Sequence, residues 1–328
     1  MKIGLVGFFG WGNFGDELFL EAHREFLSDA GDVFPINDLQ EMPYFTRPVE
    51  SVVKGCDTLV IGGGDLVIPW TMSKLYWKEE YLTKPIHIFG VGVPRWGGYD
   101  RAIVKRYRQF FQSESVKTII ARDIESANWI TKHIKPLIDV QFYPDPVLAL
   151  DLPVAEKHEE KILGISLRHR KSGPDDLTNV RELCERAKNL GYRIKHIVLG
   201  NMKTGVLDYE VASNFSTDDE EVVYSEDLMD ICQAISECSA FASMKFHGTI
   251  VASMYGVPSI VISATDKSRN FSRMICRPDT ISSLRDEFMA DRLPYFPAPI
   301  HPMVIGHLKE QAREGYRVLA SSIIRDEG

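Results

Sequence analysis

The sequence lacks any apolar run long enough to cross a membrane, because none approaches the roughly 20 residues that a transmembrane helix needs. The apolar part of Met1–Gly7 is too short for a signal peptide, and glycines follow it too early. The segment is instead typical of a first β-strand. These absences predict a cytoplasmic protein.

The cysteines are too scattered for a disulfide framework or a metal site, and the basic residues are too few for a nucleic-acid-binding protein. The five cysteines are odd in number and form no CxxC pair, which favours reduced thiols over disulfides. No clustered spacing of metal ligands occurs, so we expect no metal and no cofactor. Because 38 basic residues face 46 acidic ones, a nucleic-acid partner is not expected, since such binding needs a basic surface.

What the sequence has is a regular alternation of short apolar runs and helical patterns. The expected strands are Ile3–Gly7, Val33–Ile36, Thr58–Ile61, Ile86–Val91, Thr118–Ala121, Val140–Phe142, Ile162–Ser166, Arg193–Val198, Glu221–Tyr224, Ala240–Ser243 and Ser259–Ile262. The expected helices include Asp16–Ser28, Arg101–Phe111, Glu125–His133, Leu177–Leu190, Ser225–Glu237, Thr249–Tyr255 and about Ile305–Ile324. This order predicts βαβ units with mostly parallel sheets, covered by helices on both faces.

The length of 328 residues, 44% of them hydrophobic, suits two domains. Prolines interrupt regular structure at Tyr143–Pro146, and a charged stretch follows Leu152. We therefore predict an α/β fold of two Rossmann-like domains facing one cleft, with residues 1–150 in the first and 151–328 in the second. The pattern leaves open whether the last helix crosses back to the first domain.

Ligands of open α/β sheets bind beyond the carboxyl ends of the strands, so the segments that follow strands are the candidate sites. The first is Gly7–Glu17, which fits neither GxGxxG nor a Walker loop. One interpretation is a tight turn with Asp16 as the helix N-cap. The other is a sugar-binding loop, in which exposed Trp11 and Phe14 contact the apolar face of a pyranose and Asn13 and Asp16 bind its hydroxyls.

Two further segments of the first half are rich in glycine. Gly62-Gly63-Gly64-Asp65 ends a strand, and three successive glycines suggest that something passes close to the backbone; the alternative is a hairpin-like turn. Gly90–Gly98 carries Arg95 and Trp96 among glycines and resembles a mobile cleft loop. A later strand is followed by Arg122, for which bonding to Asp123 or to loop carbonyls is the favoured interpretation.

Basic residues gather after two strands of the second half. Arg168-His169-Arg170-Lys171 follows one strand, where Arg168 is best placed to bind a carboxylate or a phosphate with its planar fork. Lys245 and His247 precede or open a helix after another strand. The helix dipole gives an anion there only about 0.3–1 kcal/mol, whereas each charge-assisted hydrogen bond gives roughly 1.5–3 kcal/mol. Arg168 and Lys245 would therefore dominate anion binding.

At these residues the sequence resembles the polysaccharide pyruvyl transferases. The ordered motifs that carry the resemblance are Gly12-Asn13-Phe14-Gly15-Asp16-Glu17, Gly62-Gly63-Gly64-Asp65, Arg122-Asp123-Ile124-Glu125-Ser126, Asp145-Pro146-Val147-Leu148-Ala149-Leu150, and Lys245-Phe246-His247-Gly248 running into Gly256-Val257-Pro258. Each motif alone is weak, but their order and spacing together make the match fairly specific. The family more often has arginine where this chain has Lys245. Lysine keeps the positive charge but lacks the planar guanidinium group that binds an anion through two hydrogen bonds.

The resemblance implies a fold like the two-Rossmann (GT-B) glycosyltransferases and transfer of a pyruvyl group from phosphoenolpyruvate to a saccharide. It also implies a pyruvate ketal as the product, release of phosphate, and a place in exopolysaccharide or cell-surface glycan biosynthesis. The donor would bind in the second domain and the acceptor in the first. A lipid-linked acceptor would bring the enzyme to the inner face of the membrane.

The residue patterns and the resemblance together assign roles to ten residues. His247 is the expected general acid and base, since an imidazole exchanges protons near neutral pH. Donor binding falls to Arg168, Lys245 and Gly248. The acceptor or cleft loops supply Asn13, Asp16, Gly63, Gly64, Asp65 and Arg95. Two alternatives stay open at this point, namely a GT-B-type nucleotide-sugar glycosyltransferase and a non-enzymatic protein that binds phosphate or sugar.

Overall fold

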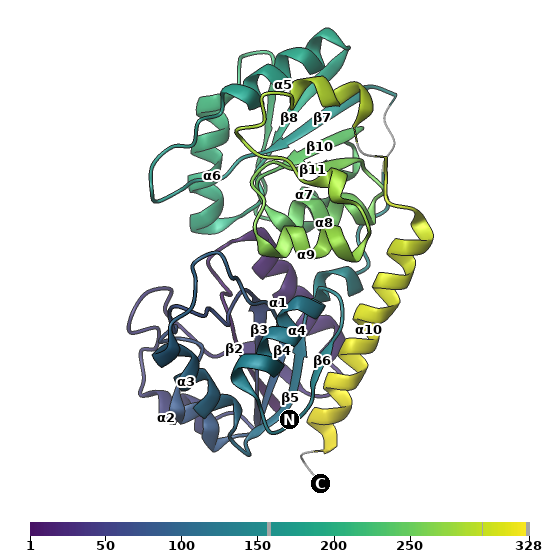
Figure 1. Cartoon of the computed structure of the whole chain (residues 1–328). Helices are drawn as coiled ribbons and strands as arrows, with labels where there is room; N and C mark the ends of the chain where they lie inside the picture. Colours follow the sequence, from purple (N-terminus) through teal and green to yellow (C-terminus); the bar gives the residue numbers. More distant parts are fainter. Residues whose placement is uncertain (156–158, 297, 326–328) are drawn as a thin grey trace. The chain divides into compact units, whose positions relative to one another are not determined.

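The chain divides into two compact units that do not follow the sequence in a simple order. The structure, a computed structural model, describes residues 1–155, 159–296 and 298–325 (Figure 1). Unit 1 contains Met1–Gly10, Leu18–Leu150 and the chain from Leu308, whereas unit 2 contains Trp11–Glu17 and Asp151–His307. Both differ from the expected ranges 1–150 and 151–328, because the last helix returns to unit 1 and the loop Trp11–Glu17 packs with unit 2.

Unit 1 is built on a parallel sheet with the strand order β2-β1-β3-β4-β5-β6. Its strands are β1 (Lys2–Val6), β2 (Asp32–Pro35), β3 (Thr58–Gly64), β4 (Ile86–Val91), β5 (Val116–Ala121) and β6 (Val140–Phe142). Its helices are α1 (Phe14–Leu27, from Leu18 on), α2 (Val49–Lys54), α3 (Arg101–Phe111), α4 (Ile124–Trp129) and most of α10 (Pro302–Arg325), with short helical turns at Glu79–Thr83, Ile130–Ile134 and Pro146–Ala149. The central strands β3 and β4 are buried along their whole length, as their continuous apolar runs predict.

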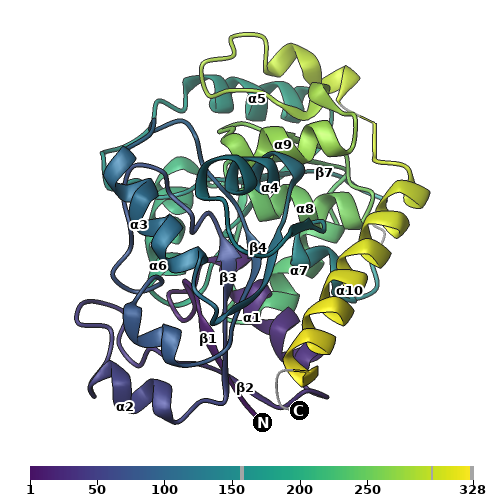
Figure 2. The ribbon, with the colours of Figure 1, turned by 60° about the horizontal axis from the view of Figure 1, so that its bottom comes forward.

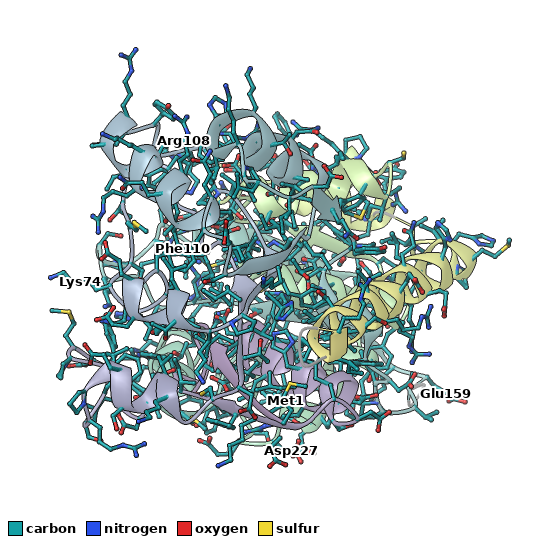
Figure 3. The ribbon with its side chains drawn as sticks, turned by 90° about the horizontal axis from the view of Figure 1, so that it is seen from below. Met1, Lys74, Arg108, Phe110, Glu159 and Asp227 are labelled. Atoms are coloured by element: carbon teal, nitrogen blue, oxygen red, sulfur yellow. The ribbon has the colours of Figure 1, made fainter. Side chains whose placement is uncertain are left out.

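Helix α3 shows how sequence sets local structure in unit 1. Asp100 caps it by accepting hydrogen bonds from the backbone N–H groups of Ala102 and Ile103. Its buried residues recur at helical spacing, and Figure 3 labels one of them, Phe110, together with Arg108 on the same helix. Arg108 donates to the backbone carbonyl of His133 at 2.8 Å.

The C-terminal helix α10 completes the core of unit 1, where it runs beside α1 (Figure 2). Tyr316 is only 1% exposed and lies 4.8 Å, between ring centroids, from both Phe26 and Phe89. Its hydroxyl lies 3.1 Å from Nδ1 of His23, and burial lowers the pKa of that histidine to about 3. The question that the sequence left open is thus answered, because α10 from Leu308 on belongs to unit 1.

Unit 2 has a second parallel sheet with the order β11-β10-β7-β8-β9. Its strands are β7 (Lys161–Ser166), β8 (Tyr192–Ile197), β9 (Glu221–Val223), β10 (Ala240–Ser243) and β11 (Ser259–Val261). Its helices are α5 (Thr178–Asn189), α6 (Met202–Phe215), α7 (Leu228–Ser236), α8 (Phe246–Met254) and α9 (Asp266–Met274), with short turns at Pro278–Thr280 and Ala290–Tyr295. Residues 246–253 of α8 are all buried, so this helix lies inside the unit rather than on its surface.

All eleven predicted strands occur in the described residues, and the predicted α/β class with parallel sheets is confirmed. The largest change is in β3, which continues through the three glycines instead of turning before them. Gly63 and Gly64 have φ angles of 83° and 103°, which glycine adopts at no steric cost. Helices α2, α6 and α9 were not predicted. In α6 the interior Gly205 weakens the helical pattern, yet packing requires it, because a Cβ there would lie 2.5 Å from the carbonyl oxygen of Gly200.

Candidate active site

The strand order of unit 2 creates a switch point between β7 and β10. From β7 the chain proceeds through β8 to β9 on one side, then returns to place β10 and β11 on the other. The two neighbouring strands end in register, with Ser166 opposite Ser243. Arg168 and Lys245 follow these ends by two residues each, so the topology brings both to the edge where α/β sheets bind ligands.

A small polar pocket of about 70 Å³ lies at this switch point. Four of the predicted site residues line it, namely Asn13, Arg168, Lys245 and His247. All four belong to unit 2, because Asn13 lies in the loop that packs with it. The structure thus gathers the predicted anion-binding and acid–base groups in one place.

His247 lies in the first turn of α8 and is 6% exposed. The loop Trp11–Glu17 covers it so closely that a Cβ on Gly15 would lie 1.7 Å from Nδ1 of the imidazole. The loop is fixed to unit 2 by hydrogen bonds from the backbone N–H of Asn201 to the carbonyl of Gly12 (2.9 Å) and from the Thr204 hydroxyl to the carbonyl of Trp11 (2.6 Å). Gly15 therefore lets the loop backbone hold the imidazole in one position.

The ammonium group of Lys245 already has protein partners. Its Nζ lies 2.5 Å from Oδ2 of Asp208, a buried residue of α6, and donates to the carbonyl of Leu199 at 2.6 Å. Burial lowers the pKa of Lys245, and the charge of Asp208 acts in the opposite direction. Asp208 also accepts a hydrogen bond from the backbone N–H of His169 at 2.7 Å. One carboxylate thus joins the two loops that carry Arg168 and Lys245.

Arg168 differs from Lys245 because no hydrogen bond or ion pair to its guanidinium occurs within the described part of the chain, and its Nε is buried. Burial, followed by the nearby charge of Arg170, lowers the pKa of Arg168. Arg170 itself is engaged, at 2.6 Å from Asp175 and 2.7 Å from the hydroxyl of Ser263. A half-buried guanidinium with this environment is suited to an anionic ligand from outside the chain.

The pocket also contains residues that the sequence reasoning missed, which are Ser263, Thr265, Lys267 and Ser268. They come from the segment between β11 and α9 and from the first turn of α9. Nζ of Lys267 lies 5.7 Å from the ring centroid of Phe246, which in turn contacts the His247 ring at 5.0 Å. The sequence contained a signal for these residues, because the segment that carries them follows the carboxyl end of a predicted strand, like the other candidate sites.

Three expectations about neighbouring residues need correction. Helix α1 begins at Phe14, so Asp16 lies in its first turn and is not the N-cap; its carboxylate accepts from the side-chain amide of Asn13. Phe14 is fully buried and offers no surface to a sugar. Gly248 does not line the pocket. A Cβ there would lie 2.4 Å from the Leu199 side chain, so close packing of the helix accounts for the glycine.

The predicted cleft residues of unit 1 do not line this pocket. Asp65 follows β3 and forms an ion pair with the buried Arg122, whose second neighbour is Asp145 at 3.6 Å. Asp123 caps α4 by accepting from the N–H of Ser126 at 2.7 Å.

The remaining predicted residues of unit 1 are two glycines and an arginine. Gly63 and Gly64 form the end of β3, and Arg95 is exposed in the loop after β4. Acceptor binding by Gly63, Gly64, Asp65 or Arg95 stays a prediction.

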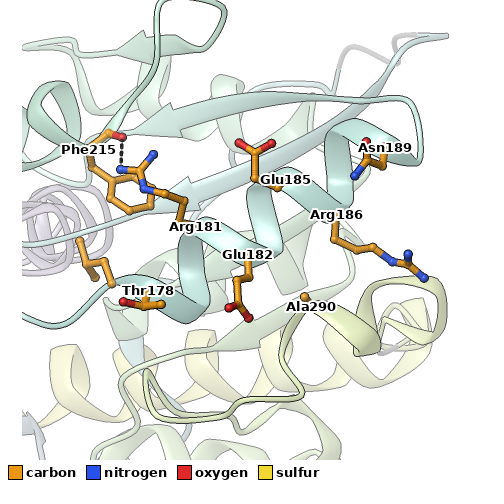
Figure 4. Close-up of a pocket in the computed structure, with 9 residues that line it drawn as sticks. Thr178, Arg181, Glu182, Glu185, Arg186, Asn189, Phe215 and Ala290 are labelled. Carbon is orange, nitrogen blue, oxygen red and sulfur yellow. Dashed lines mark hydrogen bonds between the residues drawn. The ribbon is translucent and has the colours of Figure 1, made fainter.

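A larger pocket of about 600 Å³ lies along α5, and Figure 4 shows its lining. None of the predicted site residues lines it. Arg181 is occupied there, since it donates to the carbonyl of Phe215 at 2.9 Å and lies 4.3 Å from the centroid of that ring. The pocket is not at the carboxyl ends of the strands, so we place no chemistry in it.

No helix among residues 1–155, 159–296 and 298–325 is long and apolar enough to cross a membrane. No curated protein matches this sequence. Solved structures are similar in fold at 10–14% identity. They include UDP-GlcNAc 2-epimerase from Neisseria meningitidis bound to UDP-GlcNAc (TM-score 0.54, 10% identity, 99% of this chain and 100% of that chain). The S. aureus MnaA–UDP structure has a TM-score of 0.56 at 10% identity over 96% of this chain and 92% of that one.

A third similar structure is the calicheamicin glycosyltransferase CalG4 (TM-score 0.52, 11% identity, 99% of this chain and 98% of that chain). These likenesses establish a GT-B-like fold and nothing about chemistry. The family model described as polysaccharide pyruvyl transferase matches residues 13–266, which is well over half of the chain. The match includes every residue that lines the pocket apart from Lys267 and Ser268. The chain therefore belongs to the polysaccharide pyruvyl transferase family.

Proposed function

We propose that this protein transfers the pyruvyl group of phosphoenolpyruvate to a saccharide, forms a pyruvate ketal across two hydroxyls and releases phosphate. The observation that carries the proposal is a half-buried Arg168 with no protein partner in the described chain, in the same pocket as the imidazole of His247. The acceptor belongs to exopolysaccharide or cell-surface glycan biosynthesis and is free or lipid-linked. The reaction would take place in the cytoplasm.

The chemistry needs a proton donor and acceptor next to an anion site. The two acceptor oxygens each form a bond to C2 of the donor, while the bond from C2 to the phosphate oxygen breaks. One hydroxyl proton ends on the methylene carbon, which becomes a methyl group, and the other ends on the departing phosphate. C2 is formally oxidised and the methylene carbon formally reduced by the same amount, so no external oxidant or reductant is needed. His247 can carry these protons in turn, while Arg168 stabilises the donor's carboxylate or phosphate charge.

The electrostatics and size of the pocket support a compact anionic donor. The N-termini of α8 and α9 contribute to it together with Arg168, Lys245 and Lys267. Since the Lys245 charge is paired with Asp208, Arg168 carries the larger share of donor binding. A volume of about 70 Å³ lies far below the about 300–1,000 Å³ of sites for drug-sized ligands, which favours a small anionic group such as a phosphate or a carboxylate over a nucleotide sugar.

The decisive assay follows phosphate release from phosphoenolpyruvate with a panel of soluble and lipid-linked saccharides. We expect release only when both substrates are present. Thermal shift measurements should show stabilisation by phosphoenolpyruvate and none by UDP- or GDP-sugars. Stabilisation by nucleotide sugars with no phosphate release would identify a glycosyltransferase instead, and ligand binding without any turnover would identify a binding protein.

Replacing Arg168 by alanine should raise KM for phosphoenolpyruvate about 10- to 100-fold, since each charge-assisted hydrogen bond contributes roughly 1.5–3 kcal/mol. The KM for the acceptor should stay the same. Lys171→Ala is the matched control, because it removes an exposed cation from the same loop. An unchanged donor KM in the Arg168 variant would show that the anion binds elsewhere.

Replacing Gly15 by alanine should lower kcat about 100-fold, because a displacement of the imidazole by about 1 Å is enough for such a loss. The new methyl group would overlap the His247 ring, so either the ring or the loop must move. Gly306→Ala is the control, since a Cβ there meets nothing within 4 Å. If the Gly15 variant turned over at the normal rate, the tight contact would have no catalytic role.

A further inference from the structure

A second cavity of unit 2 lies beside the polar pocket that contains His247. It has a volume of about 230 Å³, and most of its lining comes from the loop between β7 and α5, residues 168–177. Arg168 and Met244 line this cavity and also line the polar pocket of about 70 Å³. The two cavities are therefore neighbours, and Arg168 and Met244 form the wall between them.

The second cavity differs from the polar pocket in its chemistry. Its apolar lining consists of Pro174, Leu177, Val211 and Met244. The opposite charges of Arg170 and Asp175, which also line it, lie 2.6 Å apart and compensate each other, and His169 adds an exposed imidazole. The guanidinium of Arg168 has no hydrogen bond or ion pair with any residue that the structure describes. The cavity thus suits an apolar group that is attached to an anion held by Arg168.

The backbone holds Met244 firmly in this wall. Its N–H donates to the carbonyl of Ser166 at 2.9 Å, and the N–H of the next residue, Lys245, donates to the hydroxyl of Ser243 at 3.0 Å. Met244 is 3% exposed and belongs to the apolar core of unit 2. Since the backbone is fixed on both sides, the side chain leaves the wall only by changing its rotamer against packed neighbours.

We propose that Met244 determines the donor specificity of this protein by limiting the size of the donor. The polar pocket takes an anionic group of phosphoenolpyruvate, and the Met244 side chain keeps the rest of the donor out of the apolar cavity. A donor with an alkyl group on its methylene carbon would have to displace this side chain to reach the space behind it. The inference rests on the proposed function, which supplies the donor.

Core packing alone is the competing explanation for Met244. A methionine that only fills the core affects stability when it is replaced, but leaves the choice of ligand unchanged. Met289 is suited to this comparison, because it is a fully buried methionine of the same apolar core and lines neither cavity. Replacing each methionine in turn therefore separates donor specificity from stability.

The test measures binding of phosphoenolpyruvate and of its methyl homologue, (Z)-2-phosphonooxybut-2-enoate, by isothermal titration calorimetry. We expect the parent to bind the homologue about 10- to 100-fold more weakly than phosphoenolpyruvate, since one additional carbon in a closely packed site changes affinity by this order. Met244→Ala should bind the homologue about 10-fold or more tightly than the parent does, and should bind phosphoenolpyruvate as the parent does. Met289→Ala should lose stability and keep the preference of the parent.

Further variants keep the test decisive if Met244→Ala does not fold, which its melting temperature shows. Met244→Val removes less volume and should shift the preference in the same direction, whereas Met244→Leu conserves the volume and should keep the preference of the parent. Adding Val211→Phe to Met244→Ala refills the cavity from α6 and should exclude the homologue again.

The binding measurements also separate this inference from the proposed function. A switch in preference without phosphate release on any saccharide would support the role of Met244 in donor size and count against pyruvyl transfer. Equal binding of both compounds by the parent, or an unchanged preference in folded Met244→Ala or Met244→Val, would overturn the inference even if phosphate release were observed. A parent protein that does not bind phosphoenolpyruvate would overturn both.

Discussion

Replacing His247 by asparagine should lower kcat for phosphate release by about 10²- to 10⁴-fold, the range that general acid–base groups contribute. Asparagine keeps a polar planar side chain in the crowded space beside Gly15 but cannot carry a proton between substrate atoms. The donor KM should change little, because Arg168 supplies the anion contact. The measurement is steady-state phosphate release, with the melting temperature as a check on folding.

His307→Asn is the matched control for this experiment, because it makes the same chemical change at an exposed histidine of α10. It should behave like the parent. If the His247 variant retained a melting temperature and a kcat close to those of the parent, another group would have to transfer the protons, and the assignment would fail.

The second large effect is expected at Asp208, which contacts no substrate in our proposal but holds Lys245 and the Arg168 loop. Replacing it by asparagine leaves the buried ammonium of Lys245 without a countercharge. Removal of one partner from a buried ion pair costs about 3–5 kcal/mol, so the free energy of unfolding should fall by an amount of this order. Urea denaturation measures this change.

The same variant should show a steeper pH dependence of donor binding than the parent. Burial already lowers the pKa of Lys245, and Asp208 is the main group that opposes this shift. Without the carboxylate the pKa falls further, so Lys245 loses its proton as the pH rises through this lower value. The pocket then loses one positive charge, and the donor KM of Asp208→Asn should rise with pH more steeply than that of the parent.

A double variant separates a structural role from an electrostatic one. Asp208→Leu with Lys245→Met removes both charges and should recover much of the lost stability, because no buried charge is left unpaired. Donor affinity should remain low. If the double variant recovered donor affinity together with stability, the pair would be purely structural.

The parts of this site that could be predicted are those fixed by local sequence and by strand direction. Arg168 and His247 each follow an apolar strand, and parallel strands end at the same edge, so their convergence required only that β7 and β10 be neighbours. The helical spacing of α3 and the apolar runs of β3 and β4 likewise depend on residues close in sequence.

The parts that could not be predicted depend on contacts between residues far apart in the chain. Nothing near Lys245 in the sequence indicates Asp208, which is 37 residues earlier and lies on a helix weakened by Gly205. Phe14 is buried because α1 starts two residues earlier than its acidic residues suggested. Asp65 follows a glycine run that is typical of a ligand loop, yet Arg122 pairs with it.

The return of α10 to unit 1 has a consequence for synthesis on the ribosome. The buried Tyr316 packs against Phe26 and Phe89, which emerge more than two hundred residues earlier. Unit 1 therefore stays incomplete while residues 151–307 are translated, although the N-terminal domain of a chain generally folds first. During that interval the apolar surface that α10 later covers is open to chaperones and to aggregation, so translation speed should affect the yield of this protein.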